Sequence, residues 1–357
     1  VSSAIFIVIT FMIFLFLFSI SSSMIALVYM AITISLSVLA YILYKVLPRD
    51  RVTHNLKNVR IPEKMRYKML LVVGLTVSIL IGVLTYKIFG DSYLAISAAT
   101  LPLVVPGLYA RHVEKKIREI ESFFTIFIRS FGLTYSMIPH TATALASTLR
   151  SGYGPLTTYL KRLLARINAG IEAKIAWYQF IGETWSEIVR RNVNILYDSI
   201  NTGADLAKVG TVLSETTFKL LDIRKQRIQI SKAFESTIYV IHTLFSAILS
   251  FVLSLLTIFN NIVLKLQSIS SEIASVTPFK PMAIEIALNM TPIFVIILSI
   301  LNALVIKIAQ GGMYETVLVP LAILLAISGI VMWGVSLFST TIFSSITGLS
   351  SLMQITP

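Results

Sequence analysis

The sequence predicts an all-α, polytopic membrane protein with about seven transmembrane helices and one antiparallel helical-bundle domain. Three observations predict this fold class. Of the 357 residues, 56% are apolar and 13% are charged, whereas soluble domains have about 45–50% and about 25%. Uncharged runs of about 20 residues recur, and a helix of that length crosses a bilayer. Residues 111–235 instead repeat apolar positions every three to four residues, as amphipathic helices do.

Four predicted membrane helices occupy residues 1–110. The first run carries no charge and is followed by three serines, so we expect it to form a hairpin with the second run. A signal peptide is the alternative interpretation, but the first run has no basic start and no small-residue cleavage site. In the fourth run, Pro102 and Pro106 are tolerable because neighbouring helices can satisfy the freed backbone groups. The four runs are residues 1–20, 24–46, 69–89 and 93–110.

Two polar regions carry the net positive charge of the chain. The loop of residues 45–68 has eight basic and two acidic residues, and residues 111–235 have 18 basic and 11 acidic residues. Together these regions account for the whole formal charge of +13. Because basic residues accumulate on the inner side of a membrane, we expect both regions in the cytoplasm and the protein in the cell membrane.

Residues 236–357 are expected to hold three further transmembrane helices and an apolar tail. An external loop, residues 260–281, would separate the first two of these helices, and a short inner turn containing Gly311 and Gly312 would separate the last two. The uncharged tail, residues 339–357, fits either an external amphipathic segment or a broken eighth span. The three predicted helices are residues 236–259, 282–306 and 316–338.

Residues 111–235 contain four or more amphipathic helices, which implies a bundle. Pro139 ends the first helix, Pro155 lies in a helix first turn after Gly154, and Gly170 and Gly203 stand where left-handed C-terminal caps are expected. Asp205 can cap the final helix. No breaker follows before the membrane, so this last helix should continue into the next span. The first apolar face is residues 117, 120, 124, 127, 131 and 135, and the second is residues 156, 160, 163 or 164, and 167. The third is residues 185, 189, 193, 196 and 200, and the fourth is residues 206, 209, 213, 220 and 223.

The order of several motifs in this region resembles the cytoplasmic module of the type II secretion F family, whose members are membrane platforms of type II secretion, type IV pili and the archaellum. The likeness covers about residues 120–260 and is closest to the archaeal branch. Many members carry two copies of the module, whereas one is visible here. The matching features are Tyr153-Gly154-Pro155-Leu156, Gly170, a helix ending near Phe180, a Val189-Arg190-Arg191 turn, and Gly203-Ala204-Asp205-Leu206.

This resemblance implies a non-enzymatic platform without cofactors. A cytoplasmic secretion ATPase hexamer would dock on the bundle, and its motion would pass through the final helix to the spans, where pilin-like subunits are lifted from the bilayer. The oligomeric state is not fixed by the sequence, and a homodimer is one possibility. Both the archaellum version and a simpler adhesion-pilus version remain open.

The basic residues of the bundle are the candidate docking site for the ATPase. Clustered positive charge accelerates association with an acidic partner. The alternatives are a solvated face that only sets membrane orientation, or contact with anionic lipid headgroups. A nucleic-acid partner is not expected, because membrane orientation explains the charge. The candidates are Arg190, Arg191, Lys161, Arg162, Arg166, Arg224, Lys225 and Arg227.

Catalytic and metal chemistry find little support in the sequence. No Gly-rich phosphate loop is followed by Lys-Ser/Thr, the chain has no Cys, and its four histidines have no ligand-spaced neighbours. A polytopic transporter is the alternative function, since ionisable residues inside spans are functional by default. His242 is the one titratable group well inside a predicted span. Lys87, Glu285, Lys307 and Glu315 lie near predicted ends, where they should reach the interface.

Overall fold

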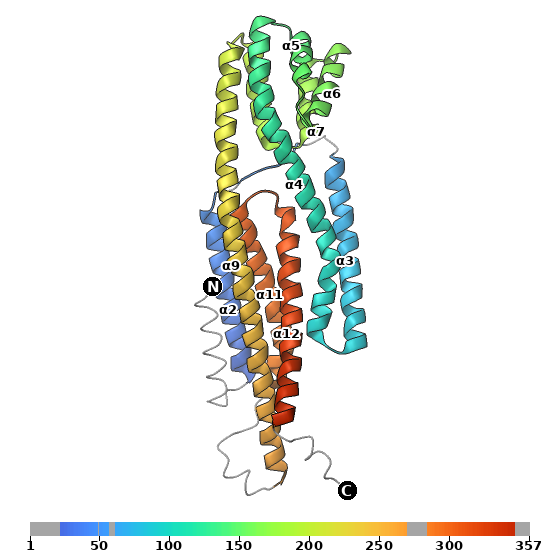
Figure 1. The fold of residues 1–357 in the computed structure, drawn as a ribbon, viewed down its shortest axis with the longest axis vertical. Coiled ribbons are helices and arrows are strands. Elements are labelled where there is room, and N and C mark those ends of the chain that lie inside the picture. The colour runs from blue at the N-terminus through green and yellow to red at the C-terminus, as the bar shows by residue number, and fades with distance from the viewer. Residues whose placement is uncertain (1–21, 49, 57–60, 270–283, 347–357) are drawn as a thin grey trace.

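The computed structural model describes residues 22–48, 50–56, 61–269 and 284–346, and over these ranges the chain is all-α. Figure 1 shows an elongated molecule with the membrane helices at one end and the bundle at the other. The helices are α2 (Ser22–Val46), α3 (Pro62–Phe89), α4 (Ser92–Met137), α5 (Thr141–Thr148), α6 (Leu156–Asn168), α7 (Ala173–Thr184), α8 (Glu187–Asn201), α9 (Leu206–Ile269), α11 (Ile284–Gln310) and α12 (Leu318–Ile346), with 3₁₀ turns η1 (Leu149–Ser151) and η2 (Tyr314–Val317).

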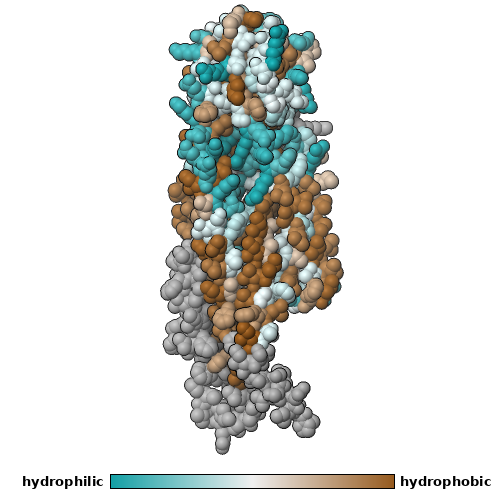
Figure 2. All heavy atoms as spheres, in the orientation of Figure 1, coloured by the Kyte–Doolittle hydropathy of each residue, from teal (hydrophilic) through white to brown (hydrophobic). Residues whose placement is uncertain are grey.

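Six helices in the described ranges are long and apolar enough to cross a membrane, namely α2, α3, α4, α9, α11 and α12. They match six of the seven predicted spans. The remaining one, residues 1–20, lies outside the described residues, as do residues 270–283 and 347–357. Figure 2 shows the apolar half of the molecule separated from the bundle by a hydrophilic belt. The chain is therefore a multi-pass membrane protein.

Two helices cross this belt without a break. The predicted continuation of the final bundle helix into the next span is confirmed, because α9 has 64 residues. Helix α4 behaves in the same way over 46 residues, which the sequence analysis did not anticipate. At a rise of about 1.5 Å per residue, these rods are about 96 Å and about 69 Å long. The bundle and the spans are thus one mechanical unit.

The prolines of α4 lie where α3 packs against it. A Cβ atom built on Gly74 of α3 would be 3.3 Å from the Pro102 carbonyl oxygen and 3.3 Å from the Pro106 ring, so the glycine permits this approach. Ser78 of α3 donates its hydroxyl to the carbonyl of Ala99, one turn before Pro102 on α4. The neighbouring helix therefore places one hydroxyl donor within a turn of Pro102.

The core of the bundle is aromatic and aliphatic. Phe124, Phe127 and Phe131 on α4 are fully buried and pack against residues of α6, α7, α8 and the start of α9. The Phe127 ring meets Tyr153 edge to face at 5.6 Å between centroids. Because such burial contributes about 1.5–3 kcal/mol for each large apolar side chain, this cluster is a principal source of bundle stability.

The predicted helix punctuation is confirmed. Helix α4 ends at Met137, before Pro139, and Pro155 directly precedes α6. The φ angles of Gly170 and Gly203 are 76° and 69°, in the left-handed region that glycine tolerates. The Asp205 carboxylate accepts hydrogen bonds from the backbone of Ala207 at 3.0 Å and Lys208 at 3.4 Å. Local chemistry alone therefore sets these boundaries.

Several further details differ from the sequence prediction, and one is that α3 begins at Pro62, within the predicted 45–68 loop. Val189, Arg190 and Arg191 form part of α8 rather than a turn, because Ser186 caps that helix by accepting from Val189 N. The fourth apolar face ends early, since Leu220 and Ile223 are exposed. Helix α9 runs to Ile269, through the start of the predicted 260–281 loop, and α12 takes up the tail as far as Ile346.

Candidate functional site at the junction of bundle and spans

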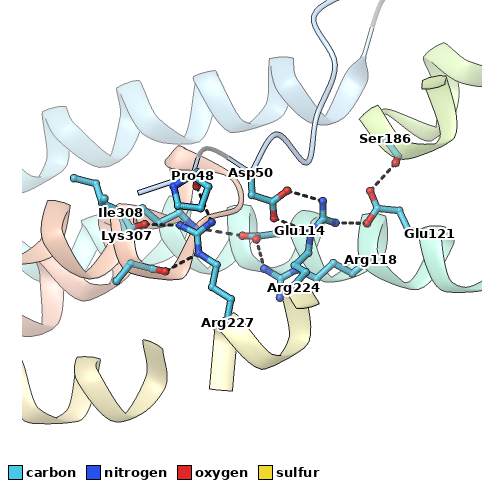
Figure 3. Close-up of polar contacts among 11 residues, drawn as sticks. Pro48, Asp50, Glu114, Arg118, Glu121, Ser186, Arg224, Arg227, Lys307 and Ile308 are labelled. Carbon is cyan, nitrogen blue, oxygen red and sulfur yellow. Dashed lines mark hydrogen bonds and ion pairs between the residues drawn. The ribbon is translucent and has the colours of Figure 1, made fainter. Parts of the chain in front are cut away.

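Buried and half-buried charges gather where the bundle meets the membrane helices. We call this set the charged junction and define it as Asp50, Glu114, Arg118, Glu121, Arg224, Arg227 and Lys307. These side chains come from α4, α9, α11 and the segment after α2, so residues far apart in sequence meet here. Figure 3 shows them arranged along α4.

Arg224 bridges two carboxylates. It is only 6% exposed, and its Nη1 donates to Glu121 Oε2 at 2.5 Å while its Nη2 donates to Asp50 Oδ1 at 2.7 Å. Glu121 is 0% exposed and also accepts from the Ser186 hydroxyl at 2.6 Å. A buried carboxylate is tolerated only when it is paired and hydrogen-bonded. Arg224 therefore holds α4, α9 and the 50–56 segment together.

A second ion-pair group joins α4 to the end of α11. Both Arg118 and Lys307 approach Glu114, the latter with its Nζ 3.7 Å from Oε2. The sequence analysis placed Lys307 at the membrane interface, but the side chain is buried against Glu114. Gly312 has a φ of 83°, and a Cβ atom built on it would overlap the Glu114 carboxylate. The glycine turn between α11 and α12 is thus what allows this contact.

Arg227 caps the end of α11. Its Nε donates to the carbonyl of Ala309 at 2.9 Å and its Nη2 to that of Ile308 at 2.8 Å. These carbonyls belong to the last turn of a helix, which lacks intrahelical donors and carries partial negative charge. Nη1 donates in addition to Pro48 O at 2.8 Å. One side chain from α9 therefore fastens α11 and the chain after α2.

Residues 50–56 lie as a strap across the bundle. The Val52 carbonyl accepts from Glu187 N at 2.9 Å, and Trp185 Nε1 donates to the His54 carbonyl at 3.3 Å. The His54 ring is buried with its Nε2 2.9 Å from the Ile181 carbonyl. Burial lowers the pKa of His54 below 6.5. The predicted basic loop and the bundle are therefore in contact, which places them on one side of the membrane.

The predicted docking residues do not form one surface. Arg224 is buried and Arg227 is occupied in capping, so the expectation that these two present positive charge to a partner is not met. Arg190 donates two hydrogen bonds to Glu187, and these lower the pKa of that carboxyl to about 2. Arg191 also contacts Glu187 but is 64% exposed.

The remaining candidates lie apart from one another. On α6, Arg166 pairs with Glu183 of α7, while Lys161 and Arg162 are exposed. Lys225 is exposed on α9. Gly154, by contrast, has a packing role that the motif did not reveal, because a Cβ atom there would lie 2.6 Å from the Phe123 ring.

A groove between α8 and α9 combines exposed apolar and basic groups. It encloses about 460 Å³, and Arg51 of the strap and Arg191 both line it. Ile195 and Leu220, which also line it, are 49% and 45% exposed. Half-exposed aliphatic side chains beside arginines are typical of a protein contact surface.

His242 lies in a buried polar cluster among the spans. Its Nε2 is 2.7 Å from the Ser328 hydroxyl and 3.2 Å from that of Ser299, and its Nδ1 is 3.1 Å from Asn302 Nδ2. Both ring nitrogens are therefore satisfied by neutral partners. In the described part of the chain, no group of three His, Cys, Asp or Glu side chains is placed to hold a metal ion.

Sequence reasoning missed the acidic half of the junction, although a signal was present. Glu114 and Glu121 follow the same helical spacing as Ile117, Phe124 and Ile128, which places both carboxylates on the buried face of α4. A carboxylate on an apolar face needs a cationic partner. Arg118 is a local partner, four positions after Glu114, but Arg224 of α9 and Lys307 of α11 come from more than 100 positions away, and no local pattern identifies them.

Two archaeal proteins named Flagella accessory protein J match the chain. The protein of Methanocaldococcus jannaschii is 25% identical over 213 residues, or 59% of this chain, and that of Methanococcus voltae is 24% identical over 304 residues, or 82% of this chain. The chain is a distant homologue of archaeal flagella accessory protein J. The resemblance to the archaeal branch of the type II secretion F family is thus confirmed.

This homology is partial in extent. The matched residues make up 38% of the first relative and 54% of the second, so the chain spans about half the length of the relatives that it matches, or less. No family model matches the chain, and no solved structure does. The comparison therefore shows that this membrane protein is a distant homologue of flagella accessory protein J.

Proposed function

We propose that this protein is the integral-membrane platform of an archaellum or type IV pilus-like machine. In this role the bundle lies in the cytoplasm and receives a secretion ATPase hexamer, and the spans guide pilin-like subunits from the bilayer into a filament. The protein contributes no chemical step and works by contact. Homology to flagella accessory protein J and the positive charge of residues 45–68 and 111–235 support this role and orientation.

The continuity of α4 and α9 through the charged junction is the observation that carries the proposal. A force applied to the bundle reaches the spans through two unbroken helices. Arg224 and Arg227 tie those helices to the strap and to α11, so neighbouring spans move with them. Rigid helices joined by buried ion pairs transmit displacement, which is what a platform under a motor requires.

The ATPase contact is assigned to the groove between α8 and α9. Its exposed Ile195 and Leu220 would bury apolar area, and Arg51 and Arg191 would attract an acidic partner. Of the eight basic residues predicted to dock the ATPase, Arg191 is the one that both lines this groove and is exposed. Arg51 of the strap also lines the groove and joins Arg191 in the proposed docking surface.

Charge reversal tests this contact. We expect the Arg51→Glu/Arg191→Glu variant to lose co-purification with the secretion ATPase of the same organism, while Lys161→Glu/Arg162→Glu on α6 retains it. Both variants should show the wild-type circular dichroism melting curve. Equal binding by both variants would refute the groove as the docking site.

Membrane sidedness is tested separately. The chain has no Cys, so a single cysteine can be placed at will. Lys87→Cys, close to the α3–α4 turn, should react with an impermeant maleimide added to intact cells, whereas Lys174→Cys on α7 should react only after lysis. The opposite labelling pattern would invert the topology and end the platform proposal.

A further inference from the structure

A hollow of about 310 Å³ opens beside the charged junction, at the level where four spans end. Arg111 follows the span portion of α4, and Glu235 precedes that of α9. Lys307 lies in the last turn of α11, and Thr316 lies in η2, which leads into α12. The apolar, membrane-spanning parts of these four helices begin directly beside the lining residues. The hollow therefore lies where the headgroups of the surrounding lipids are found.

The lining of this hollow is predominantly cationic. Two carboxylates, Glu114 and Glu235, face five basic side chains, which leaves an excess of three positive charges. The basic residues are Arg111, Lys115, Arg118, Lys232 and Lys307. An excess of this kind in a partly enclosed space concentrates anions.

Both carboxylates are already neutralised. Glu114 contacts Arg118 and Lys307, and Glu235 lies 3.8 Å from Arg111 Nη2 while accepting a hydrogen bond from Gln310 Nε2 at 2.7 Å. They therefore add little negative charge to the space. These ion pairs involve Arg111, Arg118 and Lys307, so of the five cations Lys115 and Lys232 remain without a carboxylate partner among the described residues.

Two cations in the lining have no acceptor among the described residues. Lys115 and Lys232 are exposed and make no ion pair or hydrogen bond through their ammonium groups with any described residue. Both ammonium groups can therefore bind an anion, and a phosphate oxygen is a strong, charge-assisted acceptor for such a group.

We propose that this hollow binds a phosphate group, as carried by the headgroup of an anionic lipid. Lys115 on α4 and Lys232 on α9 hold the phosphate from two sides. Basic pockets between membrane helices recognise anionic headgroups in this way. A lipid bound here would contact both rods at the point where each one enters the bilayer.

The test uses the full-length protein in detergent and native mass spectrometry. Wild-type protein is titrated in separate arms with phosphatidylglycerol, phosphatidylcholine and inorganic phosphate. We expect saturable binding of one phosphatidylglycerol that phosphatidylcholine does not reproduce. In Lys115→Gln/Lys232→Gln the dissociation constant should rise about thirtyfold, since each lysine near a headgroup contributes about fivefold.

Matched controls separate this site from general surface charge. Lys174→Gln/Lys208→Gln removes two exposed lysines of the bundle and should leave the dissociation constant unchanged. Binding of inorganic phosphate with the same dependence on Lys115 and Lys232, but without phosphatidylglycerol binding, would support the phosphate site and overturn the lipid as its source. Equal affinity in the wild-type protein and both double variants would overturn the site.

Discussion

Replacing Arg224 with Met should destabilise the bundle more than any other single change at the charged junction. The substitution keeps the volume of the side chain but leaves Glu121, which is 0% exposed, with the Ser186 hydroxyl as its one remaining donor. Removing one member of a buried ion pair costs about 3–5 kcal/mol. For a bundle of this size that loss lowers the melting temperature by about 10–20 °C.

A double-mutant cycle separates the pair from its surroundings. Glu121→Leu/Arg224→Met removes both buried charges, and such apolar replacement is often close to neutral. Asp50 is left without Arg224 but is partly exposed, so water can solvate its carboxylate. We therefore expect the double variant to recover most of the loss. This restoration distinguishes an uncompensated charge from a simple packing defect.

Tryptophan fluorescence provides the assay. Trp177 and Trp185 lie in the bundle and next to the strap, so a Trp333→Phe background confines the signal to this region. Melting is followed in the wild type, both single variants and the double variant. If Arg224→Met melts within about 2 °C of the wild type, the buried pair contributes almost nothing and the reasoning fails.

Three further predictions concern the contacts between the rods, the α11 cap and the strap. Gly132→Ala should lower the free energy of unfolding by about 1–3 kcal/mol, because the new Cβ atom would lie 2.3 Å from a carbonyl oxygen of α9. Gly334→Ala is the control and should leave stability unchanged, since its new Cβ atom meets no described atom within 4 Å. Equal melting temperatures for the two variants would contradict this packing. Arg227→Met should speed amide hydrogen exchange at the α11–α12 turn, because the last carbonyls of α11 lose their donors. Mass spectrometry measures this exchange, and an unchanged rate would refute the capping role of Arg227. Below pH 6.5 the unfolded chain protonates at His54 while the buried ring resists, because burial lowers its pKa, so stability should fall as pH decreases. His54→Gln should reduce this slope between pH 7.5 and pH 5, and identical slopes would rule out the histidine.

The sequence was sufficient for most of the helices and for those of their ends that a glycine, a proline or a capping side chain marks, because such ends depend on local chemistry. Gly170, Gly203 and Asp205 act where they stand in the chain, through a left-handed φ angle or a side-chain cap. The run of α9 into the membrane followed from the absence of any breaker between Asp205 and the next apolar segment.

The charged junction could not be derived in this way, because its pairs join distant segments. Arg224 lies among other basic residues in the sequence and therefore resembles a surface cation. Its ion pairs with Glu121 and Asp50 are visible only in the folded structure. Lys307 likewise lies near a predicted span end, where a lysine side chain usually extends to the membrane surface. In the structure it is buried and pairs with Glu114. Such choices depend on tertiary contacts that periodicity does not encode.

The two uninterrupted rods bear on how the protein can be dissected. Excising residues 111–235 as a fragment would cut α4 and α9 in mid-helix, where each new end exposes backbone groups that the intact chain satisfies. The fragment would also lack Asp50 and Lys307, so Arg224 and Glu114 would each lose a partner. An isolated bundle should therefore unfold locally where α4 and α9 are cut. A stable soluble fragment would need residues 50–56 and an added connection that holds the cut ends of the two helices together.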